Sequence, residues 1–261
     1  ARAALDEGFI CDMFEGHAPY KPRYVLPDYA KFLANGSEWL ELEGAKDLDD
    51  ALSLLTILYH HVPSVTSMPV YLGQLDALLQ PYVRILTQEE INSRIKRFWR
   101  YLDRTLPDAF MHANIGPEDT PVTRAILRAD AELKQVAPNL TFIYDPAITP
   151  DDLLLEVAKN ICECSKPHIC NGPVNDKIFT KGRYGVVSCY NSLPLAGGGS
   201  TLVRLNLKAI AEHSTSMEDF FSRALPHYCQ QQMAIIDARC DFLYQQSGFF
   251  ENSFLVKEGL I

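Results

Sequence analysis

The most informative segment of the sequence is Tyr184-Gly-Val-Val-Ser-Cys189-Tyr-Asn-Ser-Leu-Pro194, which continues as Leu195-Ala-Gly-Gly-Gly-Ser200. The apolar run predicts a buried strand over residues 184–190 that leads into a loop rich in proline and glycine. Three successive glycines remove side chains where backbone or ligand must approach closely. A cysteine at the end of such a strand can be presented to a substrate. Composition alone still favours a buried structural role for Cys189, because free cysteine is among the most buried residue types.

Helical patterns surround this strand. The run 87–106 opens with a capping box formed by Thr87 and Glu90, and its apolar residues recur on one face. Acidic residues open another run, and Thr149 followed by Pro150 opens a third. Pro226 predicts a kink or break in the last helical region. The predicted helices cover residues 47–58, 87–106, 121–137, 149–162 and 216–246.

Strands are fewer and fall between the helices. Residues 140–144 (LTFIY) are bounded by proline and asparagine and predict a buried strand, and residues 201–205 predict a third strand or the start of a helix. Helices that separate strands favour parallel pairing and an α/β class. Because the strands are few for 261 residues, we expect residues 1–261 to form a single incomplete domain.

Composition and charge exclude several classes of protein. The chain is 47% apolar, which is typical of a folded globular protein. Its formal charge of −9 opposes non-specific binding to nucleic acid or to an anionic membrane surface. No apolar run approaches the roughly 20 residues of a membrane helix. Seven cysteines, an odd number in a large chain, favour reduced thiols and a cytoplasmic location.

Several blocks resemble a known superfamily, in order and in approximate spacing. Residues 120–128 (TPVTRAILR), 138–144 (PNLTFIY), 184–189 (YGVVSC) and 203–208 (VRLNLK) are similar to the middle of pyruvate formate-lyase. With residues 9–29 (FICDMFEGHAPYKPRYVLPDY), the chain is more specifically similar to the YjjI-type branch of the glycyl radical enzymes, over essentially its whole length.

This resemblance implies a fold and a type of chemistry. The fold would be part of the superfamily's ten-stranded barrel, a half-barrel with surrounding helices. Cys189 would be the thiyl-radical cysteine, which passes hydrogen between a stored glycyl radical and a small polar metabolite under anaerobic conditions. No glycine motif of the family's Arg-Val-x-Gly-Tyr form occurs in this chain, so the chain alone is expected to be inactive.

The resemblance also implies partners. A radical-SAM activating enzyme with an iron–sulfur cluster would install the glycyl radical on the full-length protein, and a homodimer is compatible with the family. We expect no cofactor to be bound by this chain.

Two departures from the family leave the reaction open. Pyruvate formate-lyase carries adjacent cysteines at the loop tip, whereas Ser188 precedes Cys189 here, which argues against acyl transfer by that route. The diol dehydratases place a glutamate base two residues after the cysteine. Asn191 occupies that position here, and an amide cannot serve as that base.

Other candidate residues are weaker. Arg204 resembles a family arginine that binds a substrate carboxylate, although an ion pair at a strand end explains it equally well. Arg23 lies in a comparable early segment, displaced by about one residue from the family spacing. Cys162, Cys164, His168 and Cys170 have the residue types of a zinc site but not its spacing, so we predict no metal.

Two rival functions remain at this point. One is a non-catalytic superfamily member that acts as a scaffold or binding subunit. The other is an ordinary cysteine-nucleophile enzyme, which needs a histidine within hydrogen-bond reach of Cys189. The sequence near Cys189 supplies none.

Overall fold

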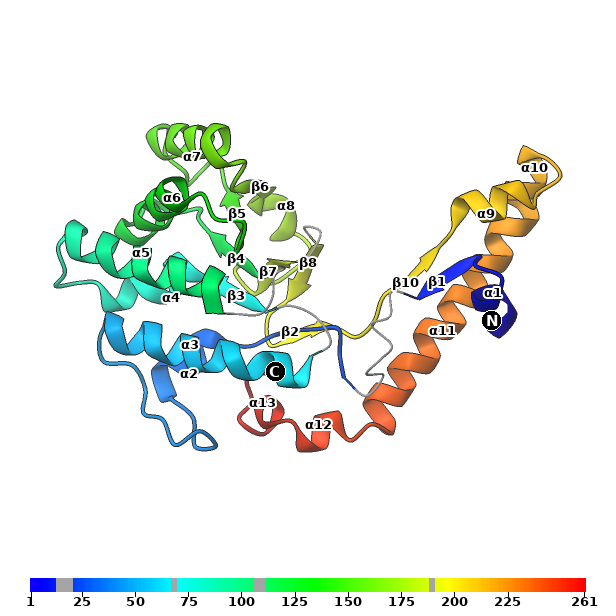
Figure 1. The fold of residues 1–261 in the computed structure, drawn as a ribbon, viewed down its shortest axis with the longest axis horizontal. Coiled ribbons are helices and arrows are strands. Elements are labelled where there is room, and N and C mark those ends of the chain that lie inside the picture. The colour runs from blue at the N-terminus through cyan, green and yellow to red at the C-terminus, as the bar shows by residue number, and fades with distance from the viewer. Residues whose placement is uncertain (13–20, 67–69, 106–110, 188–190) are drawn as a thin grey trace. The chain divides into compact units, whose positions relative to one another are not determined.

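The computed structural model describes residues 1–12, 21–66, 70–105, 111–187 and 191–261. The chain forms two compact units. The sheet unit comprises Val25–Ser64, Met68–Gly198 and Phe254–Ile261, and the helix unit comprises Ala1–Tyr24, Val65–Ser67 and Gly199–Ser253. The expectation of a single incomplete domain stays a prediction. Figure 1 labels the elements of both units.

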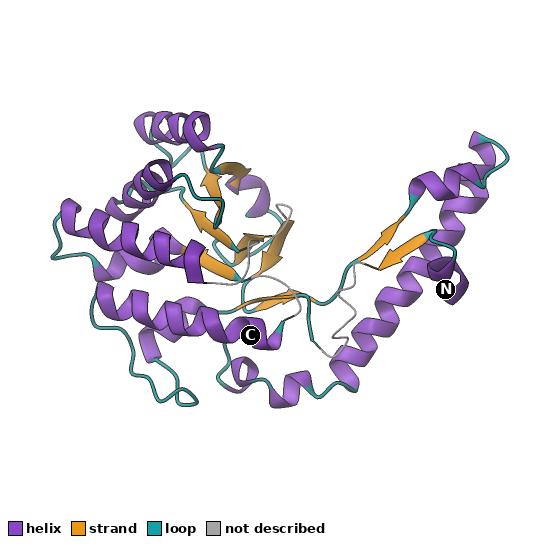
Figure 2. Cartoon of the chain, viewed as in Figure 1, coloured by secondary structure: helices purple, strands orange, loops and turns teal. Residues whose placement is uncertain are grey.

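A four-stranded parallel sheet in the order β3-β4-β5-β6 forms the centre of the sheet unit. These strands are β3 (Tyr71–Gln74), β4 (His112–Ile115), β5 (Asn139–Tyr144) and β6 (His168–Asn171). Helices α5 (Gln88–Thr105), α6 (Pro121–Leu133) and α7 (Asp151–Cys164) connect them in turn. The predicted α/β class and parallel pairing are therefore confirmed, and Figure 2 shows strands and helices alternating along the chain.

The predicted starts of α5 and α6 agree with the structure, whereas α7 begins at Asp151, one residue after the predicted first position Pro150. The Thr87 amide donates to Glu90 Oε2 over 2.9 Å, and the Glu90 amide donates back to Thr87 Oγ1 over 3.3 Å. This reciprocal pair is the expected capping box before α5. Helix α6 ends earlier than predicted, because Lys134 takes a left-handed conformation with φ 48° and closes the helix.

The helices pack through the apolar stripe that the sequence predicted. Five side chains of α5 are buried, and they recur at helical spacing: Ile91, Ile95, Phe98, Trp99 and Leu102. Burying a large apolar side chain contributes about 1.5–3 kcal/mol relative to its exposure. Helices α5 and α6 lie side by side, and α7 packs against α6 (Figure 1).

A buried carboxylate joins these helices to the sheet. Asp130 on α6 accepts hydrogen bonds from Trp99 Nε1 (3.1 Å), Asn160 Nδ2 (3.2 Å) and Cys164 Sγ (3.3 Å). It also pairs with Lys166 Nζ at 2.7 Å, and both side chains are buried. Removing one partner of such a buried pair leaves an uncompensated charge, which costs about 3–5 kcal/mol.

The helix unit contains the last long helical region. Strands β1 (Ile10–Asp12) and β10 (Val203–Leu205) pair antiparallel, so the predicted third strand is confirmed. The helices continue through α9 (Leu207–Glu212), α10 (Met217–Asp219), a π-helical turn over Phe220–Ala224, and α11 (Leu225–Gln245). A kink or break was predicted at Pro226. The structure has the π-helical turn just before it, and Pro226 itself lies in the first turn of α11.

Shorter elements complete both units. They are α1 (Arg2–Asp6), β2 (Tyr24–Leu26), α2 (Tyr29–Asn35), α3 (Leu48–Val65), α4 (Leu75–Leu79), a 3-10 turn over Gln80–Tyr82, α8 (Gly172–Asn175), β7 (Tyr184–Val187), β8 (Asn191–Pro194), β9 (Gly197–Gly199), α12 (Phe249–Asn252) and α13 (Phe254–Lys257). Within the described ranges, none of the helices combines the length and apolarity that a bilayer crossing needs.

Candidate functional site

The predicted strand at the start of the key stretch is confirmed over its described part. β7 pairs antiparallel with β8, with Tyr184 opposite Pro194 and Val187 opposite Asn191. Residues 188–190 connect the two strands in the sequence, so Ser188 and Cys189 lie outside the described residues. The assignment of Cys189 to catalysis stays a prediction.

Asn114 on β4 anchors this hairpin. Its Oδ1 accepts from the Val186 amide at 2.8 Å and from the Tyr71 hydroxyl at 3.1 Å, while its Nδ2 donates to the Val186 carbonyl at 3.0 Å. Gly185 permits the close approach, because a Cβ there would lie 2.5 Å from Cζ of Tyr71. β7 pairs with β8, and the side chain of Asn114 supplies the polar contact between the Val186 backbone and the parallel sheet.

Contacts identify which side of the sheet meets the hairpin. Ile143 on β5 packs against Tyr184 and Val186, and Cys170 on β6 joins the same cluster. Side chains alternate along a strand, so residues two positions from Asn114, Ile143 and Cys170 share their side. This hairpin-facing side consequently carries three further polar residues, namely His112, Thr141 and His168.

The register brings these residues together. Thr141 lies beside Asn114 on one flank and beside His168 on the other, while His112 lies beside Asn139. Asn114 is one pleat along β4 from His112, so His112 and Thr141 are diagonal neighbours on adjacent strands, about 7–8 Å apart.

Burial sets the charge state on this side. It lowers the pKa of His112 to about 4, and the neighbouring His168 lowers it in the same direction. The pKa of His168 is also lowered, first by burial and then by Lys166. Burial raises the pKa of Tyr184 to about 12 and raises that of the Cys170 thiol. At neutral pH these groups are therefore uncharged.

The polar groups on this side differ in their hydrogen bonding. His112 is 1% exposed, and neither of its ring nitrogens has a hydrogen-bond partner among the residues that the structure describes. Thr141 is also 1% exposed, and its Oγ1 is without a partner in the same described set. Buried polar groups are nearly always hydrogen-bonded, so two such residues on one side require an explanation.

The two predicted substrate arginines lie in the helix unit. Arg204 is on β10 opposite Cys11 and is exposed. Arg23 is half-buried. Its amide donates to the Ser200 carbonyl at 3.1 Å, and its guanidinium carbon lies 5.3 Å from the Tyr24 ring centroid. Their assignment to a substrate stays a prediction.

The residues with zinc-ligand chemistry have other partners. The Cys164 thiol donates to Asp130, Cys162 is exposed, and Cys170 Sγ accepts from Asn175 Nδ2 at 3.0 Å. Among the described residues, no three His, Cys, Asp or Glu side chains gather as metal ligands would.

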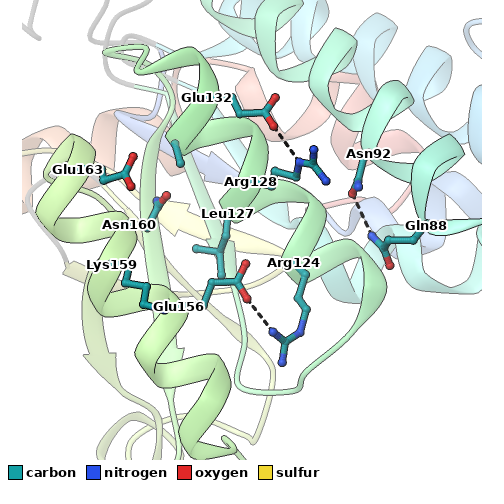
Figure 3. A pocket seen from close by; sticks show the side chains of 11 residues that line it. Gln88, Asn92, Arg124, Leu127, Arg128, Glu132, Glu156, Lys159, Asn160 and Glu163 are labelled. Atoms are coloured by element: carbon teal, nitrogen blue, oxygen red, sulfur yellow. Dashed lines mark hydrogen bonds and ion pairs between the residues drawn. The ribbon is translucent and has the colours of Figure 1, made fainter.

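A charged hollow lies elsewhere, where α5, α6 and α7 meet (Figure 3). Its volume is about 380 Å³, and Arg124 lies at its edge. The guanidinium of Arg124 pairs with Asp119, Asp152 and Glu156 at 2.6–2.7 Å. The single positive charge of Arg124 is thus shared among three carboxylates, which is typical of a structural ion-pair network at a surface.

Sequence reasoning predicted β5 but missed the other three strands of this sheet. β3, β4 and β6 have four residues each, too short for a period of two to stand out from their surroundings. His112 on β4 was therefore not predicted as a site residue, and Thr141 was not either, because the side of β5 that faces the hairpin depends on these missed strands. The available signal was a polar residue alternating with apolar ones in His112-Ala-Asn-Ile115.

Comparison with known proteins agrees with the family resemblance seen in the sequence. The family model described as "Glycyl radical enzyme YjjI-like" matches residues 1–261. The chain is 91% identical over 261 residues to the protein YjjI of Escherichia coli, covering 100% of this chain and 51% of that protein. It is 45% identical over 257 residues to a protein of Haemophilus influenzae, covering 98% of this chain and 49% of that protein. The chain thus spans about half the length of the curated relatives it matches.

Two crystal structures are similar in fold, both of the anaerobic ribonucleotide reductase from Thermotoga maritima. The one with citrate in the active site has a TM-score of 0.75 at 15% identity, covering 98% of this chain and 55% of that chain. The one with dATP and CTP has a TM-score of 0.74 at 14% identity, covering 99% and 51%. At these identities the likeness shows the fold alone.

Proposed function

Because the chain belongs to the YjjI-like glycyl radical enzyme family, we propose that it forms part of an anaerobic enzyme in which Cys189 carries a thiyl radical. The Cys189 sulfur loses a hydrogen atom to the radical site and then takes one from a C–H bond of a small polar metabolite. Returning that hydrogen to the product restores the thiol. The S–H bond suits this relay, because it is weak enough to donate hydrogen and its radical is reactive enough to take hydrogen from carbon.

The anchoring of β7 on the sheet supports this proposal more than any other observation. Val186 bonds through its amide and its carbonyl to Asn114 on β4, and Tyr184 and Val186 pack with Ile143 on β5. β7 is therefore held against one side of the sheet. Cys189 follows two residues after the last residue of β7.

The surroundings of the hairpin suit radical chemistry. The strands β3, β4, β5, β6 and β7 themselves contain no Asp, Glu, Lys or Arg, and all five lie in the described part of the chain. Val186 and Val187 are buried, as are Tyr71 and Asn114. Burial of this kind keeps water away, which protects a reactive intermediate from side reactions. We further propose that the sheet forms part of the superfamily's ten-stranded barrel, with the hairpin directed into it.

The radical and its source belong to the whole protein. A glycyl radical, installed by a radical-SAM activating enzyme, supplies the acceptor for the first hydrogen transfer. This chain contributes the thiol of Cys189 and the side of the sheet that faces the hairpin. The reaction is not an acyl transfer through paired cysteines, because Ser188 stands at the second position.

Cys189→Ser in the whole protein tests this function. The change is close to isosteric, so the protein should fold and the activating enzyme should still generate the glycyl radical. Turnover should be lost by at least a thousandfold, because a serine O–H bond is too strong for the glycyl radical to break. Electron paramagnetic resonance of the anaerobically activated protein measures the radical, and a substrate screen measures turnover.

Ser188→Ala is the matched control, and it should keep substantial activity. A Cys189→Ser variant with wild-type turnover on any identified substrate would contradict the assignment.

A further inference from the structure

A hollow lies within the sheet unit where β3 and β4 end. Its volume is about 420 Å³, and its lining residues come from two segments, residues 74–84 at the end of β3 and beyond, and residues 116–120 after β4. β3 and β4 are parallel neighbours, so both segments follow carboxyl ends of strands. In open α/β sheets, small ligands bind in the crevice outside such ends. We call this site the strand-end hollow.

Two lining residues hold the two segments together. Asp76 accepts from the Gly116 amide at 2.6 Å and from Thr123 Oγ1 at 2.8 Å. Gln74 Nε2 donates to the Gly116 carbonyl. These groups are committed to the protein itself, so they shape the strand-end hollow and leave the contact with a ligand to other side chains.

Three other lining residues are left without polar partners. Gln80 Oε1 is buried and accepts no hydrogen bond within the described ranges. Arg84 and Glu118 are exposed, and neither forms an ion pair with any residue that the structure describes. A buried unpaired acceptor is costly, and the broad terminal torsion of a glutamine allows its amide to turn Oε1 toward a donor in the hollow.

From these three groups we propose that the strand-end hollow binds a zwitterionic α-amino acid with a small aliphatic side chain. Arg84 pairs with the carboxylate of this ligand, while Glu118 and Gln80 Oε1 accept from its ammonium group. The site goes beyond the radical function, because it uses neither Cys189 nor the hairpin.

The charges of the lining favour a zwitterion over an anion. Among the described residues that line the hollow, Arg84 is the one cation, and Asp76 and Glu118 are the two acids. Burial raises the pKa of Asp76 to about 6, so this carboxyl is mostly ionised at pH 7. An excess of negative charge opposes a phosphate or a dicarboxylate and favours a ligand that carries an ammonium group. A simple amine would leave Arg84 without a partner.

The placement of the three groups also suits an amino acid. Gln80 begins the 3-10 turn and Arg84 follows two residues after its end, so an acceptor and a cation come from one short segment. Glu118 comes from the loop after β4. An α-amino acid carries both of its charges on one carbon, so it needs partners of both signs within a small space. The apolar lining residues that would contact its side chain are Ala77, Pro81 and Pro117.

Equilibrium binding to the whole protein, without activation, tests the proposal. The probes are L-alanine, propionate and ethylamine. Propionate is alanine without its ammonium group, and ethylamine is alanine without its carboxylate. Calorimetry and saturation-transfer NMR at pH 7 should show binding of L-alanine. Propionate and ethylamine should each bind about tenfold more weakly or worse, because each loses the partner of one charged group.

Three variants connect the binding to the named residues. Arg84→Met and Glu118→Gln should each weaken the binding of L-alanine by about tenfold or more. Neither should move the urea midpoint, because both side chains are exposed and unpaired. Gln80→Leu should also weaken binding, whereas its urea midpoint should stay unchanged or rise, because the change removes an unpartnered acceptor. A merely structural role of Gln80 predicts a lower midpoint and an unchanged affinity.

Arg97→Met is the matched control for Arg84→Met. Arg97 is exposed on α5, lies outside the strand-end hollow and likewise forms no ion pair with a described residue. Its replacement should leave the binding of L-alanine unchanged.

Three results would overturn the proposal: propionate or ethylamine bound as tightly as L-alanine, no binding of L-alanine by the folded protein, or L-alanine binding unaffected in both Arg84→Met and Glu118→Gln. None of these would affect the radical function, which stands or falls on the electron paramagnetic resonance of activated protein and the turnover of Cys189→Ser.

Discussion

At the scale of single residues, this chain places uncharged polar groups where the sheet meets the hairpin and places its buried charges elsewhere. Asp130 and Asp76 are both buried carboxylates. Neither belongs to a strand of the sheet or hairpin, because Asp76 is on α4 and Asp130 is on α6. Asp76 accepts from the Gly116 amide at 2.6 Å, from Thr123 Oγ1 at 2.8 Å and from the Ala77 amide at 2.8 Å. It thereby joins the ends of β3 and β4 to the start of α6.

Asp76 should make stability depend on pH. Burial raises its pKa from 3.8 to about 6, against the hydrogen bonds that lower it. The folded protein thus holds this proton more tightly than the unfolded chain does. Its contribution to the free energy of unfolding is largest below about pH 4 and is lost as pH rises through about 6.

Asp76→Asn should remove this dependence. The free energy of unfolding of the parent minus that of the variant should fall by about 1–3 kcal/mol between pH 4 and pH 7. Urea denaturation at several pH values measures it. A difference that is constant or that rises with pH would show that Asp76 is not the titrating group.

At the scale of elements, the hairpin depends on one side chain for its position. β7 has no backbone ladder with β3 to β6, and Asn114 bonds both polar groups of the Val186 backbone instead. The rest of the contact is apolar, through Ile143, Tyr184 and Val186. Because apolar contact is non-directional, the amide of Asn114 sets the register of the hairpin on the sheet.

Asn114→Leu should release the hairpin. The substitution keeps the volume but leaves the Val186 amide, the Val186 carbonyl and the Tyr71 hydroxyl unpaired. We expect a loss of about 2–4 kcal/mol in the free energy of unfolding and faster hydrogen exchange at the Val186 amide.

Asn92→Leu on α5 is the matched control, because the Asn92 side chain accepts a surface hydrogen bond from Gln88 Nε2. It should change stability by about 0.5 kcal/mol or less. Unchanged exchange at Val186 in Asn114→Leu would mean that the apolar contacts alone hold the hairpin.

At the scale of the whole molecule, the chain exposes apolar side chains in its helix unit. Met217 is 73% exposed and Phe221 60%, and both precede α11. Met233 and Tyr244 on α11 are also more than half exposed. The curated relatives are about twice as long as this chain. Several exposed apolar side chains along one helical region offer a surface that another segment or chain can cover.

The chain by itself should therefore associate. We expect light scattering after size exclusion to show concentration-dependent oligomers, together with binding of an apolar dye. The double change Phe221→Ser and Met233→Gln should shift the population toward monomer. Ile85→Ser, at an isolated residue that is 93% exposed, should not. A parent chain that stays monomeric and binds no dye would contradict this expectation.

From the sequence alone, the family and most of the long helices could be predicted, and Cys189 could be named as the candidate thiol. Long amphipathic runs such as that of α5 carry enough turns for their period to be recognised, and capping residues such as Thr87 mark where they begin. The sequence motif around Cys189, a strand followed by a loop, resembles that of glycyl radical enzymes. The family model matches the chain over residues 1–261.

The residues that surround the hairpin could not be identified before the strands were seen packed together. His112, Thr141 and His168 are separated by nearly thirty residues each along the chain, and they meet because parallel strands align their levels across the sheet. Four-residue strands hold too little local pattern to be recognised, since tertiary pairing rather than intrinsic propensity makes them strands. The unpartnered state of His112 and Thr141 is likewise a property of their packed surroundings, which no single segment of sequence contains.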